Sequence, residues 1–285
     1  MTPRPRYLAL GLVLSLSVAF SIDASASAAG SHAARTTDAR VVSPFLMHGR
    51  VGSALRVRGE HRGQRIARHW TFTGLSCGGN VCRRLSLLRE RSAHRYSRIV
   101  LHRIGVGRYA GSSRFYAALK CRGKLYRRGE DVPYRITVNV TQAVTVQGIR
   151  FARKLTATYT NRRRIDRTKC PIGPSHDAAR YSGVASVLPS PPTADFAATV
   201  NPSTDDAQFT DTSSPGVGGA PIVSRQWQFG DPASGAANTA DTTTPAHTFS
   251  APGVYSVSLV VTDANGLSST TTQPVTAPGP PTSPR

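Results

Sequence analysis

The sequence lacks segments with a helical stripe, and after residue 22 it lacks any run long and apolar enough to cross a bilayer, which needs roughly 20 residues. The motifs G-x-S-x-G and H-E-x-x-H and the phosphate loop are also missing. These absences argue against a helical fold and against the common hydrolase and nucleotide-binding classes. We therefore expect no catalytic residues, no cofactor and no metal site.

The first 28 residues have the order of a secretory signal peptide. Two arginines precede an apolar run from Leu8 to Ile22, and Ala-x-Ala cleavage sites end at Ala26 or Ala28. The run is short for a membrane span, so cleavage is favoured, with a retained N-terminal anchor as the alternative. We expect a secreted, extracellular protein, free or loosely attached to the cell envelope.

The chain has only four cysteines, a number that fits an oxidising compartment: Cys77, Cys82, Cys121 and Cys170. Four cysteines allow three pairings, and sequence alone does not choose between them. Cys77 and Cys82 form a natural local pair because the intervening "GGNV" can turn sharply. That pair would leave Cys121 with Cys170. Zinc is the alternative, but the spacings match no common zinc pattern.

Charge divides the chain in two. Residues 27–192 carry 32 basic and seven acidic residues, a net formal charge of +25, whereas residues 193–285 carry two basic and seven acidic residues, a net of −5. Lysine is scarce, with four in the whole chain, so arginine supplies most of the positive charge. An arginine-rich composition can reflect a GC-rich genome, but both halves share one genome. The asymmetry therefore favours an anionic partner for the first half.

In the basic half, apolar residues alternate with polar ones, as in half-buried antiparallel strands. Residues 134–140 and 149–159 show this period most clearly, and Trp70 shares a face with Phe72. About seven or eight strands fit between Phe45 and Cys170, so we predict a small barrel or sandwich closed by disulfides. The Trp-x-Phe strand, the Cys-closed hairpin and the later cysteine pair resemble uncharacterised exported β domains of actinobacteria, for which no function is known.

The second half has its own alternating segments, with aromatic residues at core positions. It contains "ADFAA" (194–198), "QFTDTSSP" (208–215), "IVSRQWQFGD" (222–231) and "TPAHTFSAPGVYSVSLVVTDANG" (244–266). On these segments it closely resembles a PKD domain, an immunoglobulin-like module. The resemblance covers nearly all of residues 192–277. It implies a two-sheet β-sandwich that acts as a spacer or contacts proteins.

The resemblance gives structural roles to residues of "QWQFGD". Trp227 and Phe229 are expected in the core, Gly230 and Asp231 in the turn that follows, and Tyr255 near the corner before a later strand. Pro232 stands where the family usually has Gly, which puts an ion contact at Asp231 in doubt. We expect Asp231→Ala to cost far less stability than Trp227→Ala.

The expected organisation of the chain has five parts. They are a signal peptide (1–28), a basic disulfide-containing β domain (41–172), an exposed linker rich in Pro, Ser, Ala and Gly (173–191), the PKD-like domain (192–277) and a flexible tail (278–285).

One stretch imitates an enzyme motif. "GVGRYAG" (105–111) spells a dinucleotide-binding fingerprint, but the residues after it alternate as a strand where the fingerprint needs a helix. A glycine-rich hairpin is the better interpretation. His69 and His102 are expected on strands as half-exposed residues, and Glu130 and Asp131 in a turn.

Two arginine-rich clusters flank the second cysteine pair. "CRGKLYRRGED" follows Cys121 and "NRRRIDRTKC" precedes Cys170, so a bridge would bring nine cations together at one end of the domain. The predicted ligand-binding residues are Arg122, Lys124, Tyr126, Arg127, Arg128, Arg162, Arg163 and Arg164. The predicted partner is an anionic envelope polymer or extracellular nucleic acid, since arginine takes phosphate or carboxylate oxygens two at a time. A solvated loop rim, an extracellular hydrolase and a purely structural surface protein are the alternatives.

Overall fold

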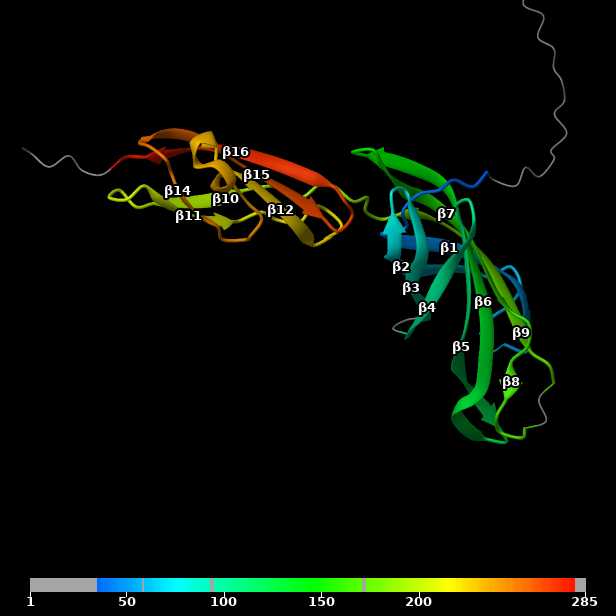
Figure 1. The fold of residues 1–285 in the computed structure, drawn as a ribbon. Helices are drawn as coiled ribbons and strands as arrows, with labels where there is room; N and C mark the ends of the chain where they lie inside the picture. Colours follow the sequence, from blue (N-terminus) through cyan, green and yellow to red (C-terminus); the bar gives the residue numbers. More distant parts are fainter. Residues whose placement is uncertain (1–34, 58, 93–94, 171–172, 280–285) are drawn as a thin grey trace, which may run out of the picture. The chain divides into compact units, whose positions relative to one another are not determined.

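The structure, a computed structural model, describes residues 35–57, 59–92, 95–170 and 173–279 (Figure 1). Apart from one short 3-10 turn, η1 (Pro232–Asn238), every regular element in these residues is a β-strand. The all-β fold class predicted from the alternation is confirmed. The expected signal peptide and most of the expected tail lie outside the described residues.

The N-terminal domain is a closed antiparallel barrel. Strands β1 to β6 each pair with the next strand in sequence, and β9 pairs with both β7 and β1, which closes the ring. Because the ring is closed, this domain is a barrel, whereas the sequence allowed either a barrel or a sandwich. The strands are β1 (Pro44–Leu55), β2 (Arg65–Gly78), β3 (Val81–Ser92), β4 (Arg95–Gly105), β5 (Arg108–Cys121), β6 (Lys124–Val146), β7 (Ile149–Asn161), the short β8 (Ile165–Asp166) beside β6, and β9 (His176–Ala185).

Alternate side chains of each strand fill the barrel. On β6, Tyr134, Ile136 and Val138 are buried, whereas Arg135 between them is exposed. Trp70 on β2 is fully buried, and its ring lies 5.0 Å from that of Tyr181 on β9. Burial of each large apolar side chain contributes about 1.5–3 kcal/mol, so this interior holds the domain together.

Strand β9 lies where an exposed linker was expected. Residues 176–185 form a buried-and-exposed alternation in which Asp177, Ala179, Tyr181 and Ala185 face inward. The expected linker over 173–191 is therefore wrong across this strand. The small residues Ala, Ser and Gly dominate it and conceal its period, yet without β9 the barrel would remain open.

The C-terminal domain is a β-sandwich. One sheet contains β10 (Phe196–Val200), β11 (Asp206–Asp211) and β14 (Ala246–Thr248), and the other contains β13 (Thr239–Ala240), β12 (Ile222–Gln228), β15 (Gly253–Asp263) and β16 (Ser268–Ala277). As expected, Trp227 and Phe229 are about 1% exposed and lie in the core. Gly230 has φ +75°, and a side chain there would collide with the backbone of Ser256, so the turn requires glycine. The Tyr255 hydroxyl donates to the Ala251 carbonyl oxygen at 2.7 Å and fixes the start of β15.

Candidate anion-binding surfaces of the barrel

Two disulfides cross-link the barrel. Cys77 pairs with Cys82 within the β2–β3 hairpin, and Cys121 pairs with Cys170, their α-carbons 6.4 Å apart. The second bridge ties the end of β5 to the segment that follows β8. The pairing favoured by the short "GGNV" turn is confirmed.

The arginine clusters after Cys121 and before Cys170 meet at this bridge. β8 pairs with β6, Glu130 opposite Asp166, and the Arg167 amide donates to the Gly129 carbonyl oxygen at 2.9 Å. Arg122 and Gly123 form a tight two-residue turn between β5 and β6. We call the resulting surface the basic end of the barrel. Its exposed cations are Arg122, Lys124, Arg127, Arg128, Arg162, Arg163, Arg167 and Lys169.

A tyrosine that sequence reasoning missed joins the two clusters. The guanidinium of Arg128 lies 4.0 Å from the centre of the Tyr116 ring, and that of Arg167 lies 4.7 Å from the same centre. Tyr126, which was predicted to be a ligand-binding residue, does not join the clusters in this way. Its ring centre lies 5.2 Å from the Lys124 ammonium nitrogen. Cation–π contacts of this kind contribute about 0.5–1 kcal/mol at exposed sites, so Tyr116 helps hold two like charges together.

Arg164 does not belong to the basic end. Its side chain is 9% exposed and makes ion pairs with Asp177 at 3.1 Å and with Glu130 at 3.3 Å. Burial lowers the pKa of Arg164, but the two carboxylates outweigh burial and the net pKa is raised. The prediction that Arg164 binds an external ligand is therefore wrong, because the side chain is occupied inside the barrel.

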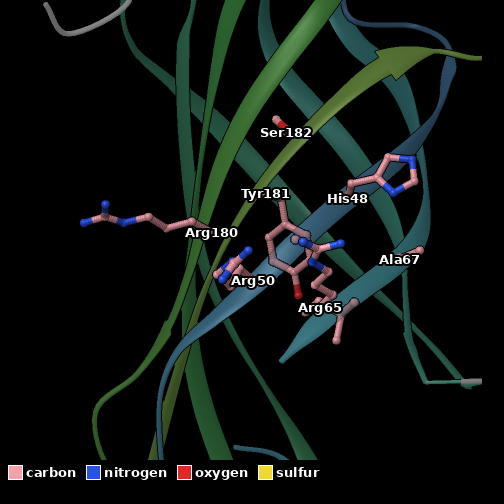
Figure 2. A pocket seen from close by; sticks show the side chains of 9 residues that line it. His48, Arg50, Arg65, Ala67, Arg180, Tyr181 and Ser182 are labelled. Atoms are coloured by element: carbon pink, nitrogen blue, oxygen red, sulfur yellow. The ribbon is translucent and has the colours of Figure 1, made fainter. Parts of the chain in front are cut away.

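A second basic surface lies on the outer wall. Arg50 on β1 stands directly opposite Arg65 on β2 and Arg180 on β9, so three arginines form one row across three strands. Figure 2 shows the side chains that line the hollow at this row, His48 and Ser182 among them. None of the described residues lining it is Asp or Glu. Like charges directly opposite each other destabilise a sheet, so the three arginines repel one another across β1, β2 and β9.

Sequence reasoning missed this arginine row because it depends on strand register. The three arginines are far apart in sequence, and only the β1–β2 and β1–β9 pairings bring them together. The stretch "GVGRYAG" was interpreted correctly: residues 105–108 turn between β4 and β5, with Gly107 at φ +56°.

Asp231 has a larger role in the sandwich than a turn residue. It is 1% exposed, and its carboxylate accepts hydrogen bonds from the Ser250 amide at 2.8 Å, the Ser250 hydroxyl at 2.6 Å and His247 Nε2 at 3.2 Å. His247 Nδ1 lies 3.0 Å from the Ala237 carbonyl oxygen, so both ring nitrogens lie within hydrogen-bond distance of an oxygen atom. Burial raises the pKa of Asp231, but the bonds from Ser250 and His247 outweigh burial and the net pKa is lowered.

Two consequences follow for Asp231 variants. Asp231→Ala should destabilise the sandwich by about 3 kcal/mol or more, since it leaves buried partners unpaired, and not mildly as the sequence led us to expect. Because the folded pKa lies below the unfolded value of about 3.9, the stabilisation is complete above that pH and is lost as pH falls through the folded pKa.

Urea unfolding followed by the Trp227 indole NMR signal measures the effect of pH. Between about pH 4 and pH 2, wild type should lose more unfolding free energy than Asp231→Asn does. Asp241→Asn, which changes an exposed aspartate of the same domain, is the matched control and should follow wild type. Parallel pH curves for wild type and Asp231→Asn would contradict the assignment.

Comparisons with known proteins place the sandwich in a family. Residues 189–277 match the model of the PKD domain, and the fold agrees, so this part of the chain is a PKD domain. The match covers less than a third of the chain and points to an extracellular module. No curated protein matches the chain.

Two solved PKD domains are similar to this part of the chain. The PKD1 domain of Vibrio anguillarum Epp is 25% identical, with 33% of this chain and 100% of that chain covered and a TM-score of 0.29. The PKD1 domain from the Vibrio cholerae metalloprotease PrtV is 31% identical, with 31% and 98% covered and a TM-score of 0.27.

The part of the chain that the structure describes holds neither a candidate membrane-spanning helix nor a candidate metal-binding cluster. There, no helix has the length and apolar character that crossing a bilayer requires. Likewise, no group of three or more His, Cys, Asp or Glu side chains is arranged to hold a metal ion within those residues.

Proposed function

We propose that this chain is a secreted, non-catalytic binding protein of the cell envelope. In this proposal the barrel binds an anionic polymer, such as a phosphate-rich wall polymer or extracellular nucleic acid, at its basic end. The PKD domain acts as a spacer or contacts proteins. The observation that carries the proposal is the convergence of two arginine-rich clusters, some 40 residues apart in sequence, around Tyr116.

The charges at the basic end support polymer binding. Eight cations are exposed there, and none of them forms an ion pair with a described Asp or Glu. Asp131 pairs with Arg114 at 3.2 Å, and Asp166 accepts hydrogen bonds from the Thr168 amide and hydroxyl. The cations therefore remain available to phosphate or carboxylate oxygens, which arginine binds in pairs.

The alternative of an extracellular hydrolase would be favoured by a titratable cluster in a deep pocket. Glu60 and Asp177 do line a cavity at one end of the barrel, but Asp177 is held by Arg164. None of the described residues lining that cavity is Ser, Thr, Cys or His, the usual nucleophiles and bases. The side chains on this face therefore support binding better than catalysis.

The polymer site is tested by removing charge in two places. One variant changes Arg127, Arg128, Arg162 and Arg163 to Ser, and a matched control changes the exposed Arg83, Arg84, Arg98 and Arg153 to Ser. Affinity for DNA and for teichoic-acid-type polyphosphate is measured over a series of salt concentrations. The basic-end variant should bind at least tenfold more weakly, and its salt slope should decrease by roughly 0.9 for each lost phosphate contact.

The control decides whether net charge alone attracts the polymer. Equal losses from both variants would show that no localised site exists at the basic end. A third variant, Arg50→Ser with Arg65→Ser and Arg180→Ser, removes the arginine row on the outer wall. If only that variant lost affinity, the polymer would lie on the wall and the proposed site would be wrong.

A further inference from the structure

We propose that the inside of the barrel, at the end where β3 and β4 meet, binds a small organic anion through Arg89. The ligand class is a single-ring molecule that carries a carboxylate or a phosphate. This cavity shares Tyr116 with the exposed basic end, but it is lined by different arginines, and the inference does not depend on polymer binding.

The cavity has a volume of about 200 Å³ and lies among inward-facing side chains of the barrel. Five arginines and two acids line it, a strong excess of positive charge. One of the five, Arg164, is neutralised by Asp177 and Glu130. The one acid left among the described lining residues is Glu60. It is outnumbered by the other four arginines, Arg68, Arg89, Arg91 and Arg95.

The strand period explains how arginines enter the interior. On β3, Leu85, Leu87, Arg89 and Arg91 are spaced two apart and share one face. The interior face of β3 therefore changes from leucine to arginine towards this end of the barrel. On β2, Arg68 follows the phase of Trp70 in the same way.

Arg89 is a buried cation without a carboxylate partner. The residue is 4% exposed, and within the described part of the chain no acid lies at ion-pair distance. Its guanidinium lies 4.4 Å from the ring centre of Tyr134 and 4.8 Å from that of Tyr159, and Nε donates to Ser97 Oγ at 3.2 Å. These contacts orient the cation but leave its charge uncompensated, which is costly in a protein interior.

Two more polar groups beside Arg89 lack partners. Arg91 Nε and the Tyr134 hydroxyl are buried and form no hydrogen bond with any described residue. Burial, and then the neighbouring charge of Arg89, lower the pKa of Arg91. Tyr134 does not line the cavity, whereas Arg89 and Arg91 do. An anion placed beside these two arginines would satisfy the Arg91 donor and relieve the repulsion between them.

The rest of the lining defines the body of the ligand. Phe115, Tyr159, Tyr181 and Ile66 supply apolar surface, and the Arg91 guanidinium covers the Phe115 ring at 4.2 Å. A cavity of about 150 Å³ holds one benzene molecule, so this one has room for a ring bearing an acidic group. Eight-stranded barrels have an interior that is either filled by side chains or able to hold one small ligand.

Isothermal titration calorimetry on the full chain tests the proposal with benzoate and phenyl phosphate. Benzyl alcohol, of similar size but neutral, is the ligand control. We expect one of the anions to bind with one-to-one stoichiometry, and benzyl alcohol to bind at least tenfold more weakly. If neither anion binds, or if benzyl alcohol binds equally well, the proposal is wrong.

The variant Arg89→Met removes the charge and keeps an unbranched side chain. We expect anion affinity to fall at least tenfold and the melting temperature without ligand to stay the same or rise, because an unpaired buried charge is lost. Arg98→Met, at an exposed position of β4, should change neither quantity. A lower melting temperature with unchanged anion binding would show that Arg89 is a structural residue and overturn the proposal.

The variants already described distinguish binding inside the cavity from binding at the basic end. The basic-end variant should keep its affinity for phenyl phosphate, and Arg89→Met should keep its affinity for polyanions. Loss of phenyl phosphate binding in the basic-end variant, with Arg89→Met unaffected, would place the anion outside the barrel.

Discussion

Trp227→Ala is expected to lower the unfolding free energy of the PKD domain by about 3–5 kcal/mol, the usual cost of truncating a large core residue. Trp227 is 1% exposed, and its ring centre lies 5.2 Å from that of Phe196 and 5.6 Å from that of Phe209. Its indole N–H donates to the Thr242 carbonyl oxygen at 2.8 Å. The substitution therefore empties the place where the two sheets meet and also leaves a carbonyl without its partner.

The effect is large relative to the stability of a small domain, which is typically about 5–15 kcal/mol. No cysteine lies in residues 189–277, so no disulfide limits the loss. Hydrogen-exchange mass spectrometry on peptides from β12 and β15 measures the local unfolding free energy. Val223→Ala on the same strand is the control, since Val223 is 61% exposed and should cost little. Equal costs for the two substitutions would mean that Trp227 is not a core residue.

Much of the PKD domain could be predicted from sequence because its signals are local. Trp227 and Phe229 are two residues apart, so their shared face follows from the strand period alone. Asp231 was misjudged because its partners, His247 and Ser250, lie on a later segment that no local pattern connects to it. The turn was predictable, whereas the buried hydrogen bonds of Asp231 with His247 and Ser250 were not.

In the barrel, by contrast, the features that matter most could not be predicted from local sequence signals. Its strands were visible as alternation, but closure depends on β9, where Ala, Ser and Gly replace the large apolar residues that mark a strand. Arg89 was overlooked for a related reason. A charged residue at an inward-facing position looks like an interruption of the apolar pattern until the cavity around it is known.

The candidate binding surfaces also differ in how far the sequence could predict them. The meeting of the two clusters at the basic end followed from the cysteine pairing that the short "GGNV" turn favours, although spacing alone left three pairings open. Tyr116 and the row of Arg50, Arg65 and Arg180 depend on strand register and side-chain direction. Neither is determined by residues close in sequence.

Replacing Cys121 and Cys170 together by Ser should lower the unfolding free energy of the barrel by about 4 kcal/mol in the chain-entropy model, given a sequence separation of 49. The matched control replaces Cys77 and Cys82, which are separated by only five positions, and should cost about half as much. The PKD domain should keep its stability in both variants, because it contains no cysteine. Hydrogen exchange of barrel and PKD peptides measures the two domains separately.

The same pair of variants tests whether the Cys121–Cys170 bridge shapes the basic end. Without it, noncovalent contacts hold the second cluster against the first. They include the two residue pairs of β8, the Arg167–Gly129 hydrogen bond, the Arg164–Glu130 ion pair and the contacts with Tyr116. Polyanion affinity should then fall several-fold although net charge is unchanged, because the cations spread over a larger volume before binding. The Cys77 and Cys82 control should bind as wild type does. If the Cys121 and Cys170 variant kept full affinity while its barrel remained folded, convergence of the two clusters would not matter for binding, and total charge would explain the interaction.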